Sequence, residues 1–352
     1  MGIQLLLPQQ QDVRIRHELC SVELKEQHSW LYNYHSKMLQ MVGKQIAAAR
    51  HALEVLKAHG YRVGRLHYLT HEEYNSFTYN QSGFMIKNCK LWLSKIGSIK
   101  LVLHRQPVNI KQVTVIRQAG KWYAVVACET AKPVFRFIDP SKSVGIDVCI
   151  TKFSHDSDNY VIENPLFFGK MLLPLKRAHR KVSRRQKGSN NREKARRMLA
   201  RLYDRIHNRR KNFLHKLSTY YSQRYDIIFL ERLRTLNMVR NHRLARHILD
   251  SGWRTFKDML GYKAKMAVEV EPHNTSVDCS RCRNSVPKSL AVRIHRCDKC
   301  GLVLDRDYNT NLNILQKGLL SLYHLPVERR EVTPVEIPRE SLKQEAHFVR
   351  HG

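Results

Sequence analysis

Residues 143–148 read SVGIDV and residues 225–231 read YDIIFLE, and each stretch is a short apolar run that ends on or beside a carboxylate. Runs of this length and composition are typical of buried β-strands. Two further strands are predicted, at 160–163 and at 266–270. Together these strands predict an α/β sheet, with Asp147 and Glu231 projecting from one of its edges rather than from its core.

A third acid, Asp307, lies later in the chain. It opens an apolar-periodic stretch through Leu312, Ile314 and Leu315 that predicts a helix, and its carboxylate is expected near the same sheet edge. Three converging carboxylates can hold two Mg²⁺ ions about 4 Å apart, which activate water and stabilise the leaving oxygen in phosphodiester cleavage. The alternative interpretation is that each acid only caps a helix or ends a turn, which is the commoner role of Asp at a strand end.

Four of the cysteines form two close pairs. Cys279 and Cys282 are one CxxC pair, Cys297 and Cys300 are the second, and 14 residues separate the pairs. This spacing predicts a zinc ribbon, in which two thiolates from each pair close a tetrahedron around Zn²⁺ and leave no open position for a catalytic water. The predicted role is therefore structural. Chance cysteines or a redox pair are the alternatives, and the isolated position of the other cysteines favours a reducing compartment.

The charge of the chain points to a polyanionic partner. The 352 residues include 62 Lys and Arg against 30 Asp and Glu, a formal net charge of +32, which is too basic for an ordinary metabolic enzyme and favours nucleic acid. Residues 170–211 hold 17 Lys and Arg against Glu193 and Asp204. A long helix with an apolar stripe is predicted in the later half of this stretch, and a solvated helix face is the alternative to phosphate contact. The residues predicted to contact phosphates are Lys176, Arg177, Arg180, Lys181, Arg184, Arg185, Lys187, Arg192, Lys194, Arg196 and Arg197.

The N-terminal part has a different pattern of apolar residues. Helical periodicity over 24–59 predicts one long helix or a helical pair, and β-like runs at 76–79, 111–117 and 122–128 predict an antiparallel sheet or small barrel. Beyond Gly318 the periodicity is lost, so a disordered tail is expected. No stretch has the length of a signal-peptide core or membrane span, so a cytoplasmic, nucleoid-associated location is expected.

Several motifs together resemble the TnpB (OrfB) family of bacterial and archaeal insertion sequences, which are RNA-guided DNA nucleases related to type V CRISPR effectors. The resemblance covers roughly residues 31 to 318. It rests on NSFTYNQSGF at 75–84, SVGIDV at 143–148, SRRQKGSNNREKARR at 183–197, FLER at 229–232, the cysteine pairs, and LDRDYNTNLNIL at 304–315.

The resemblance implies an RNase H-like (RuvC-type) nuclease domain with a zinc ribbon inserted before its last acid, and an N-terminal α+β part that grips guide RNA and target duplex. The expected divisions are an unmatched segment at 1–20, a guide- and DNA-binding region at 21–135, the first part of the nuclease domain with its basic helices at 136–272, the ribbon at 273–303, the last nuclease segment at 304–318, and the disordered tail at 319–352.

Matched residue by residue, Asp147 resembles the first catalytic acid of the family and Glu231 the second. Asp307 stands in a D-x-N position and is preferred over Asp305 as the third, and Arg293 resembles an arginine that assists the active site. The implied cofactors are one structural Zn²⁺, two catalytic Mg²⁺ and a guide RNA. The implied partners are that RNA, transcribed from the transposon end, and target double-stranded DNA.

The sequence also departs from the family pattern. Residues 1–20 do not match the opening strand and helix of the family, so the chain is expected to be truncated or remodelled at its start. Cys149 replaces a small glycine and is expected to crowd the metal site, while Thr310-Asn311 replaces two alanines and Arg283 a glycine. The leading hypothesis is an Mg²⁺-dependent RNA-guided DNA endonuclease, and the alternative is a TnpB-like protein that binds nucleic acid without cutting it.

Overall fold

The computed structural model describes residues 22–67, 74–130, 137–233, 235–289, 292–323 and 343–348. The chain divides into two compact units, one formed by Met1–Lys132 with Arg339–Gly352 and the other by Pro133–Pro338. The unmatched segment expected at 1–20 lies outside the described residues.

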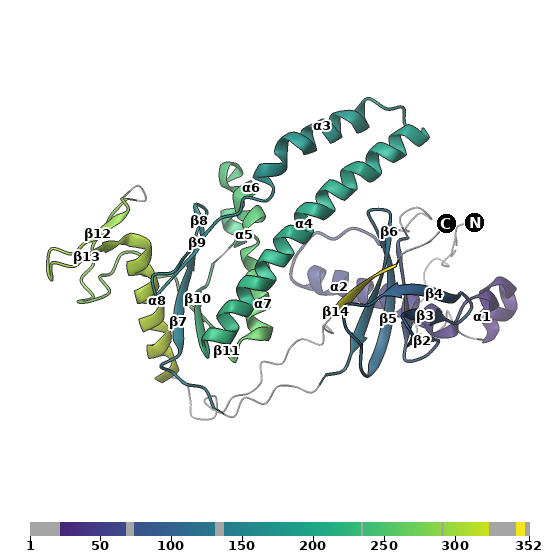
Figure 1. Ribbon diagram of the computed structural model, residues 1–352, viewed down its shortest axis with the longest axis horizontal. Helices are drawn as coiled ribbons and strands as arrows, with labels where there is room; N and C mark the ends of the chain where they lie inside the picture. Colours follow the sequence, from purple (N-terminus) through teal and green to yellow (C-terminus); the bar gives the residue numbers. More distant parts are fainter. Residues whose placement is uncertain are drawn as a thin grey trace. The chain divides into compact units, whose positions relative to one another are not determined.

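The first unit combines helical segments with an antiparallel sheet (Figure 1). Its helical elements are α1 (Val22–Gln27), the 3-10 helix η2 (Ser29–Asn33) and α2 (Ser36–Ala58). Its strands are β1 (Ser76–Asn80), β2 (Phe84–Lys87), β3 (Lys90–Leu93), β4 (Gly97–Val102), β5 (Ile110–Gln118), β6 (Lys121–Cys128) and β14 (Lys343–Phe348). Among the described residues, these seven strands form one sheet in the order β1-β5-β6-β14-β4-β3-β2. The segment expected to be helical at 24–59 is therefore broken into successive helices rather than forming one long helix.

Strand alternation builds the core of this unit. In β3, Leu91 and Leu93 are fully buried whereas Lys90 and Trp92 are exposed. This alternation is expected for a sheet with one solvent-exposed face. The core consists of Tyr79, Leu91, Leu93, Leu101, Val113, Val115, Ala124 and Val126. The β5–β6 hairpin turns at Ala119-Gly120, where both residues have positive φ, 49° and 79°, as a type I′ turn requires.

The second unit is built on a mixed sheet. Its strands are β7 (Ser143–Val148), β8 (Lys152–Asp156), β9 (Val161–Glu163), β10 (Ile227–Glu231) and β11 (Met266–Val270). The order across the sheet is β11-β10-β7-β8-β9; β7, β8 and β9 pair antiparallel, whereas β10 runs parallel to β7 and β11 runs parallel to β10. The strands predicted from the sequence are confirmed, and β8 is an additional one.

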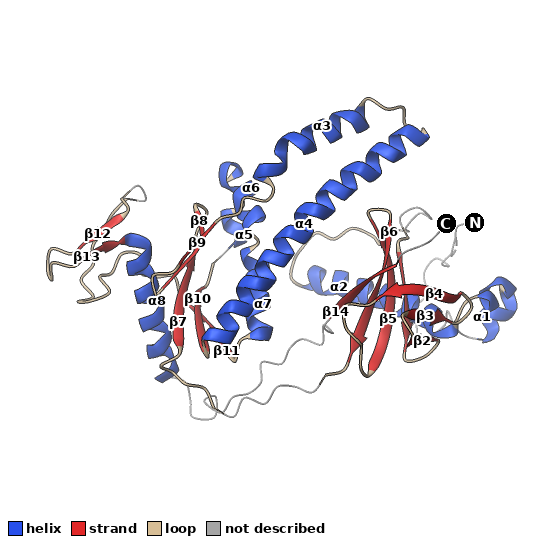
Figure 2. Cartoon of the chain, viewed as in Figure 1, coloured by secondary structure: helices blue, strands red, loops and turns tan. Residues whose placement is uncertain are grey.

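Helices cover both faces of this sheet (Figure 2). The remaining elements are η3 (Gly169–Met171), α3 (Leu172–Ser183), α4 (Asn190–Arg224), α5 (Thr235–Met238), α6 (His242–Ser251), α7 (Trp253–Lys263), α8 (Arg306–Tyr323), β12 (Ile294–Arg296) and β13 (Val303–Asp305). In β10, Ile228 and Leu230 pack against α4 and α7, while Ile227 and Phe229 pack against Ile314 of α8. The period-two pattern of β10 therefore assigns one face of the sheet to α4 and α7 and the other to α8.

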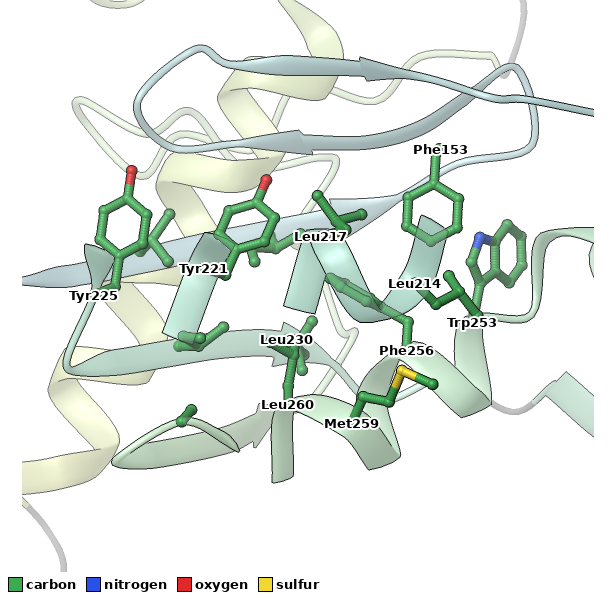
Figure 3. Close-up of a cluster of buried hydrophobic side chains, with 14 of the residues drawn as sticks. Phe153, Leu214, Leu217, Tyr221, Tyr225, Leu230, Trp253, Phe256, Met259 and Leu260 are labelled. Carbon is green, nitrogen blue, oxygen red and sulfur yellow. The ribbon is translucent and has the colours of Figure 1, made fainter. Parts of the chain in front are cut away.

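The larger core lies between the sheet and α4 with α7 (Figure 3). Phe153 of β8 packs edge to face on Phe256 of α7, with ring centroids 5.4 Å apart, and Tyr221 of α4 packs similarly on Phe256 at 6.2 Å. The buried members are Val144, Ile146, Phe153, Leu214, Leu217, Tyr221, Tyr225, Ile228, Leu230, Ile248, Trp253, Phe256, Met259, Leu260 and Ala264. This core holds β7 and β10 side by side at their C-terminal ends.

Two glycines let α8 approach the other face closely. A β-carbon on Gly145 of β7 would lie 2.5 Å from the main-chain oxygen of Asn311, which is well inside van der Waals contact. A β-carbon on Gly318 of α8 would collide with the ring of Phe229. Because neither glycine has a side chain, α8 sits directly on β7 and β10.

The basic stretch folds as a helical hairpin. Helices α3 and α4 pack against each other in antiparallel directions (Figure 1). Ser189 caps α4 by accepting a hydrogen bond from the N–H of Arg192 at 3.2 Å. The Arg192 guanidinium donates to the carbonyl oxygens of Val182 and Arg185, at 3.2 and 2.8 Å. The predicted long helix is confirmed as α4, and its first turn closes the end of α3.

The expected disordered tail is wrong for part of its length. Helix α8 continues past Gly318 to Tyr323, where Leu319 and Leu322 pack in the core beneath it. Lys343–Phe348 forms β14, which pairs antiparallel with both β6 and β4 of the first unit. Residues 324–342 and 349–352 lie outside the described part of the chain.

Candidate functional site

Strand alternation places two acids on the same face of the second sheet. Ile146 packs on the side of α4 and α7, so the next residue, Asp147, faces α8. The same holds for Leu230 and Glu231 on β10. The parallel register sets Leu230 beside Ile146, so the two acids are neighbours. Asp307 lies in the first turn of α8, which packs across this face, and the structure therefore brings the three predicted acids together.

Burial and neighbouring charges shift the pKa values of Asp147 and Glu231. The pKa of Asp147 is raised to about 7. Burial is the largest cause, and the nearby carboxylates of Glu231 and Asp307 add to it. Burial also raises the pKa of Glu231, although the hydroxyl of Thr275, which donates to Glu231 Oε1 at 2.9 Å, and the charge of Lys317 act in the opposite direction. A cation among the three carboxylates would favour the ionised form of Asp147.

The three acids offer only oxygen ligands. In the described part of the chain, the ligand atoms of three or more His, Cys, Asp or Glu residues gather within 4.8 Å of one another only at the four cysteines. The carboxylates are thus more widely spaced than that. Such a set suits Mg²⁺, which prefers oxygen ligands and usually retains several waters.

Two neighbours of Asp147 set its environment. Its backbone N–H donates to Asn311 Oδ1 at 2.7 Å, which ties β7 to α8. The Cys149 thiol lies 3.5 Å from Asp147 Oδ2 and donates to it, and burial together with the Asp147 charge raises the pKa of that thiol. The expected crowding by Cys149 therefore takes the form of a hydrogen bond to the carboxylate.

Asp305 has a different task from Asp307. Its Oδ1 accepts from the backbone N–H groups of Asp307 and Tyr308, at 2.9 and 3.1 Å, and so caps the N-terminus of α8. Asp307 is 7% exposed and contributes to the charge felt by Asp147. The side chain of Asp307, rather than that of Asp305, therefore faces the other two acids.

Arg293 lies beside the third acid. Its guanidinium Nη1 is 3.8 Å from Asp307 Oδ1, and its main-chain oxygen accepts from the N–H of Arg306 at 2.7 Å. More than half of its side chain is exposed. The segment that leads into β12 thus presents a cation beside Asp307.

The four predicted cysteines converge. Their sulfur atoms all lie within 4.8 Å of one another, with Cys279 Sγ 3.6 Å from Cys300 Sγ and Cys282 Sγ 3.5 Å from Cys297 Sγ. A hydrogen bond from the backbone N–H of Cys300 lowers the pKa of Cys297, which favours its thiolate form. Four sulfurs, two from each CxxC pair, can hold a zinc ion.

Buried amides bind this cysteine cluster to α8, a feature that the sequence analysis missed. Asn309 accepts from the N–H of Ser280 at 3.0 Å and donates to the Asp278 carbonyl at 2.8 Å. Asn313 donates to the same carbonyl at 2.7 Å and to that of Thr275 at 2.9 Å. In the sequence both asparagines look like ordinary polar helix residues, and only the fold shows that they are buried.

His155 is a second residue that the sequence analysis missed. It lies directly opposite Asp147 in the β7–β8 ladder and is 1% exposed. Its Nε2 is 2.9 Å from Asn159 Oδ1, and its ring stacks on Tyr308 with centroids 5.8 Å apart. No sequence signal identified it, because β8 itself was not predicted.

The predicted phosphate-binding residues cluster around the α3–α4 hairpin. A groove of about 500 Å³ is lined by Arg177, Arg180, Lys181, Arg184 and Arg185. Lys176, Lys187 and Lys194 are also exposed, whereas Arg196 and Arg197 form ion pairs with Glu193. Arg192 differs from the rest, because its guanidinium is engaged by the main chain of the α3 end.

Comparison with known proteins gives consistent matches. The family described as "Probable transposase" (OrfB_IS605) matches residues 130–242, and the "Cas12f1-like, TNB domain" matches residues 253–314. A "Putative RNA-guided DNA endonuclease" of Streptomyces pristinaespiralis is 35% identical over 79% of this chain and 71% of its own length. The "Putative RNA-guided DNA endonuclease InsQ" of Escherichia coli K12 is 34% identical over 66% of this chain and 63% of its own length.

A solved structure, the Cas12f1–sgRNA–target DNA complex, matches 58% of this chain and 45% of that chain, with 20% identity and a TM-score of 0.39. None of the described helices combines the length and apolarity that a membrane crossing needs.

Proposed function

Since the chain belongs to the TnpB family, we propose that it is an RNA-guided DNA endonuclease that hydrolyses phosphodiester bonds at Asp147, Glu231 and Asp307. The observation that carries this proposal is the convergence of the three acids, from β7, β10 and α8, with the pKa of Asp147 raised to about 7 by burial and by the other two carboxylates. An isolated cap or turn residue has no such coupling. Carboxylates held together against their repulsion are typical of a cation site.

The metal requirement follows from the ligand type. We assign two Mg²⁺ ions to the three carboxylates, because Mg²⁺ prefers oxygen ligands. When bound, the ions would supply an activated water and neutralise the charge that develops on the phosphate. The chain's own residues hold the acids in place: Asn311 fixes Asp147, Thr275 orients Glu231, and Arg293 places a guanidinium beside Asp307.

The sheet order supports assigning the second unit to the RNase H-like (RuvC-type) fold. An antiparallel β7–β8–β9 meander continues into two strands that are parallel to β7, and the acids stand at the ends of β7 and β10. We place the zinc ribbon, with Cys279, Cys282, Cys297 and Cys300 as ligands of one structural Zn²⁺, as an insertion before the last acid.

Guide RNA and target double-stranded DNA are the proposed nucleic-acid partners, in the prokaryotic cytoplasm. The net charge of +32 and the arginine-lined groove of the α3–α4 hairpin provide phosphate contacts that carry no sequence information. Base pairing with the guide would then supply sequence specificity, as it does for RNA-guided effectors in general.

One observation favours the alternative of binding without cleavage. The Cys149 thiol donates a hydrogen bond to Asp147 Oδ2, and this bond occupies one of the oxygens that a cation needs. The thiol is protonated at neutral pH because its pKa is raised. Replacing Cys149 with glycine would free that oxygen.

The experiment that tests the proposal uses the purified full-length chain. Bound RNA is extracted and sequenced, and a plasmid carrying a sequence complementary to its guide portion is incubated with the complex and Mg²⁺. Cutting at the matched site, absent with EDTA and with a mismatched plasmid, is the expected result. A wild-type complex that binds RNA and the plasmid but leaves it intact would establish the non-cleaving alternative, and cutting by C149G would trace the loss to the Cys149 hydrogen bond.

A further inference from the structure

One face of the first unit carries a row of lysines at fixed positions. In the ladders of β2, β3 and β4, Lys87 lies directly opposite Lys90, and Lys90 lies directly opposite Lys100. All three side chains are exposed. Directly opposed residues on neighbouring strands point to the same face, so three ammonium groups form a line across the sheet.

Among the described residues, no acidic side chain pairs with this row. Between Asn75 and Cys128 the sequence has eight Lys and Arg and no Asp or Glu. The ion pairs among the described residues include none of the three lysines. Like charges directly opposite one another destabilise a sheet, so an arrangement that repeats on three strands indicates an anionic partner.

A second row on the same face carries an exposed indole. Trp92 lies opposite Met85 on one side and Ser98 on the other, two residues from the lysine row in each strand. Met85 is 54% exposed and Trp92 43% exposed. Two residues along a strand measure about 7 Å, a distance comparable to the separation of phosphate and base within one nucleotide.

Another tryptophan of the same sheet shows how an exposed indole is normally covered. Trp122 of β6 is 37% exposed, and the guanidinium of Arg117, directly opposite, lies 5.9 Å from its ring centroid. Trp92 has no such cation over its ring among the described residues. Its face is therefore available to an aromatic partner.

We propose that this face, defined by Lys87, Lys90 and Lys100 with Trp92 and Met85, binds a single-stranded segment of the RNA. The lysine row contacts successive phosphates, and Trp92 stacks on an unpaired base, with Met85 packing beside it. The proposal rests on the proposed function and specifies where the RNA contacts the first unit. RNA is favoured over the target because stacking needs an unpaired base, and single-stranded stretches are the usual sites of RNA recognition.

The test measures binding of the full-length chain to a fluorescein-labelled, unstructured single-stranded RNA over a range of salt concentrations. Since each lost phosphate contact on a single strand removes about 0.7 from the slope of log K against log salt, K87Q/K90Q/K100Q is expected to lower the slope by about 2. The triple arginine variant K87R/K90R/K100R should keep it. The single variant K90Q is compared with K121Q, which removes one exposed lysine from β6 of the same sheet. K121Q should lower the RNA affinity less than K90Q does.

Substitution of the indole tests the stacking contact separately. W92A should weaken binding to this RNA about tenfold, and W92F should retain most of the affinity. W122A is the matched control, because Trp122 is already covered by Arg117, and it should bind as the wild type does. With the same RNA carrying 4-thiouridine, irradiation should give a cross-link in the peptide that contains Trp92.

The outcomes separate this inference from the proposed function. If the wild-type chain binds no RNA, the proposed RNA-guided function is wrong. Wild type that binds RNA, with all of these variants binding equally well, would overturn only the surface. Thermal unfolding distinguishes a contact from damage, because removing like-charge repulsion should leave the Tm of K90Q unchanged or higher. A loss of affinity that follows a fall in Tm, or a larger loss for duplex DNA than for RNA, would also overturn the proposal.

Discussion

The backbone N–H of Asp147 donates to Asn311 Oδ1 over 2.7 Å, and Asn311 stands one helical turn after Asp307 on α8. The strand that carries one acid is thereby fixed to the helix that carries another. Asn311 is fully buried, so no water competes for this bond. The spacing of the acids depends on an amide that is not itself a proposed metal ligand.

Replacing Asn311 should disturb cleavage more than RNA binding. N311A leaves the Asp147 N–H buried and without its partner, which costs about 1–3 kcal/mol and lets β7 and α8 shift relative to each other. Cleavage rate and RNA affinity are measured side by side. N208A, which removes an exposed asparagine of α4, is the control and should leave both quantities unchanged. Equal cleavage by N311A and wild type would contradict the positioning role.

Single alanine substitutions of the three acids should each abolish cleavage. D147A, E231A and D307A each remove one ligand of the proposed cation site, so we expect a complete rather than a graded loss. RNA and DNA affinity should stay equal or rise slightly, because a negative charge near phosphate has been removed. Guided plasmid cleavage and equilibrium binding are measured for each variant. Full cleavage by any of the three variants would show that the replaced acid is not a member of the site.

Asp305 should behave differently from Asp307. D305A removes the cap of α8, at a cost of about 1 kcal/mol, and should reduce cleavage partially by loosening the turn that carries Asp307. D305S restores a capping oxygen and should recover most of the activity. The opposite pattern, with D305A inert and D307A active, would exchange the assignments of the two acids.

The stability of the metal-free protein should depend on pH through Asp147. Its pKa is raised to about 7 in the folded chain, so the folded state holds a proton that the unfolded state releases, and stability falls as pH rises toward 7. D147N carries no charge and should be more stable than wild type at pH 8, by on the order of 1–4 kcal/mol. This advantage should shrink at pH 5.5. Thermal unfolding in EDTA at both pH values measures it.

The metal-loaded state gives the complementary result. Mg²⁺ should raise the Tm of wild type at pH 8 and raise that of D147N by less, because binding favours the ionised carboxylate. This readout does not depend on cleavage. A D147N variant that is less stable than wild type in EDTA at pH 8 would contradict the raised pKa.

The cysteine cluster should contain about one zinc per chain, since four thiolates complete a structural site. C279S and C297S should lose the metal and make residues 273–303 sensitive to protease. C89S, at an exposed and isolated cysteine, should keep it. Because Asn309 and Asn313 bind the carbonyl of Asp278, zinc loss should also weaken cleavage. Metal analysis measures the zinc content, limited proteolysis measures the exposure of residues 273–303, and the cleavage assay measures the effect of zinc loss on activity.

The local features of the sheet were predictable from sequence because they depend on short patterns. SVGIDV and YDIIFLE are apolar enough to identify β7 and β10, and the CxxC spacing identifies the cysteine cluster. Strand β8 reads KFSHD and was missed, because Ser154, His155 and Asp156 are polar although all three are buried. His155 was missed with it.

Long-range contacts account for the other differences. Gly318 looked like the end of a helix, yet it lies inside α8, where its missing side chain makes room for the ring of Phe229. The strand β14 has partners in β4 and β6, more than 200 residues away along the chain, and its short polar sequence carries no sign of them. The asparagines of α8 likewise have partners that only the fold reveals.

The close fit of α8 on Gly145 makes steric bulk a second means of control over the acid cluster. A methyl group at position 145 has no space beneath the helix, so G145A would lift Asp307 away from Asp147 without altering any carboxylate, thiolate or lysine. Charge and binding surfaces would be preserved while the acids are separated. A chain altered in this way would keep its proposed nucleic-acid contacts and all three acids, and would be silenced by geometry alone.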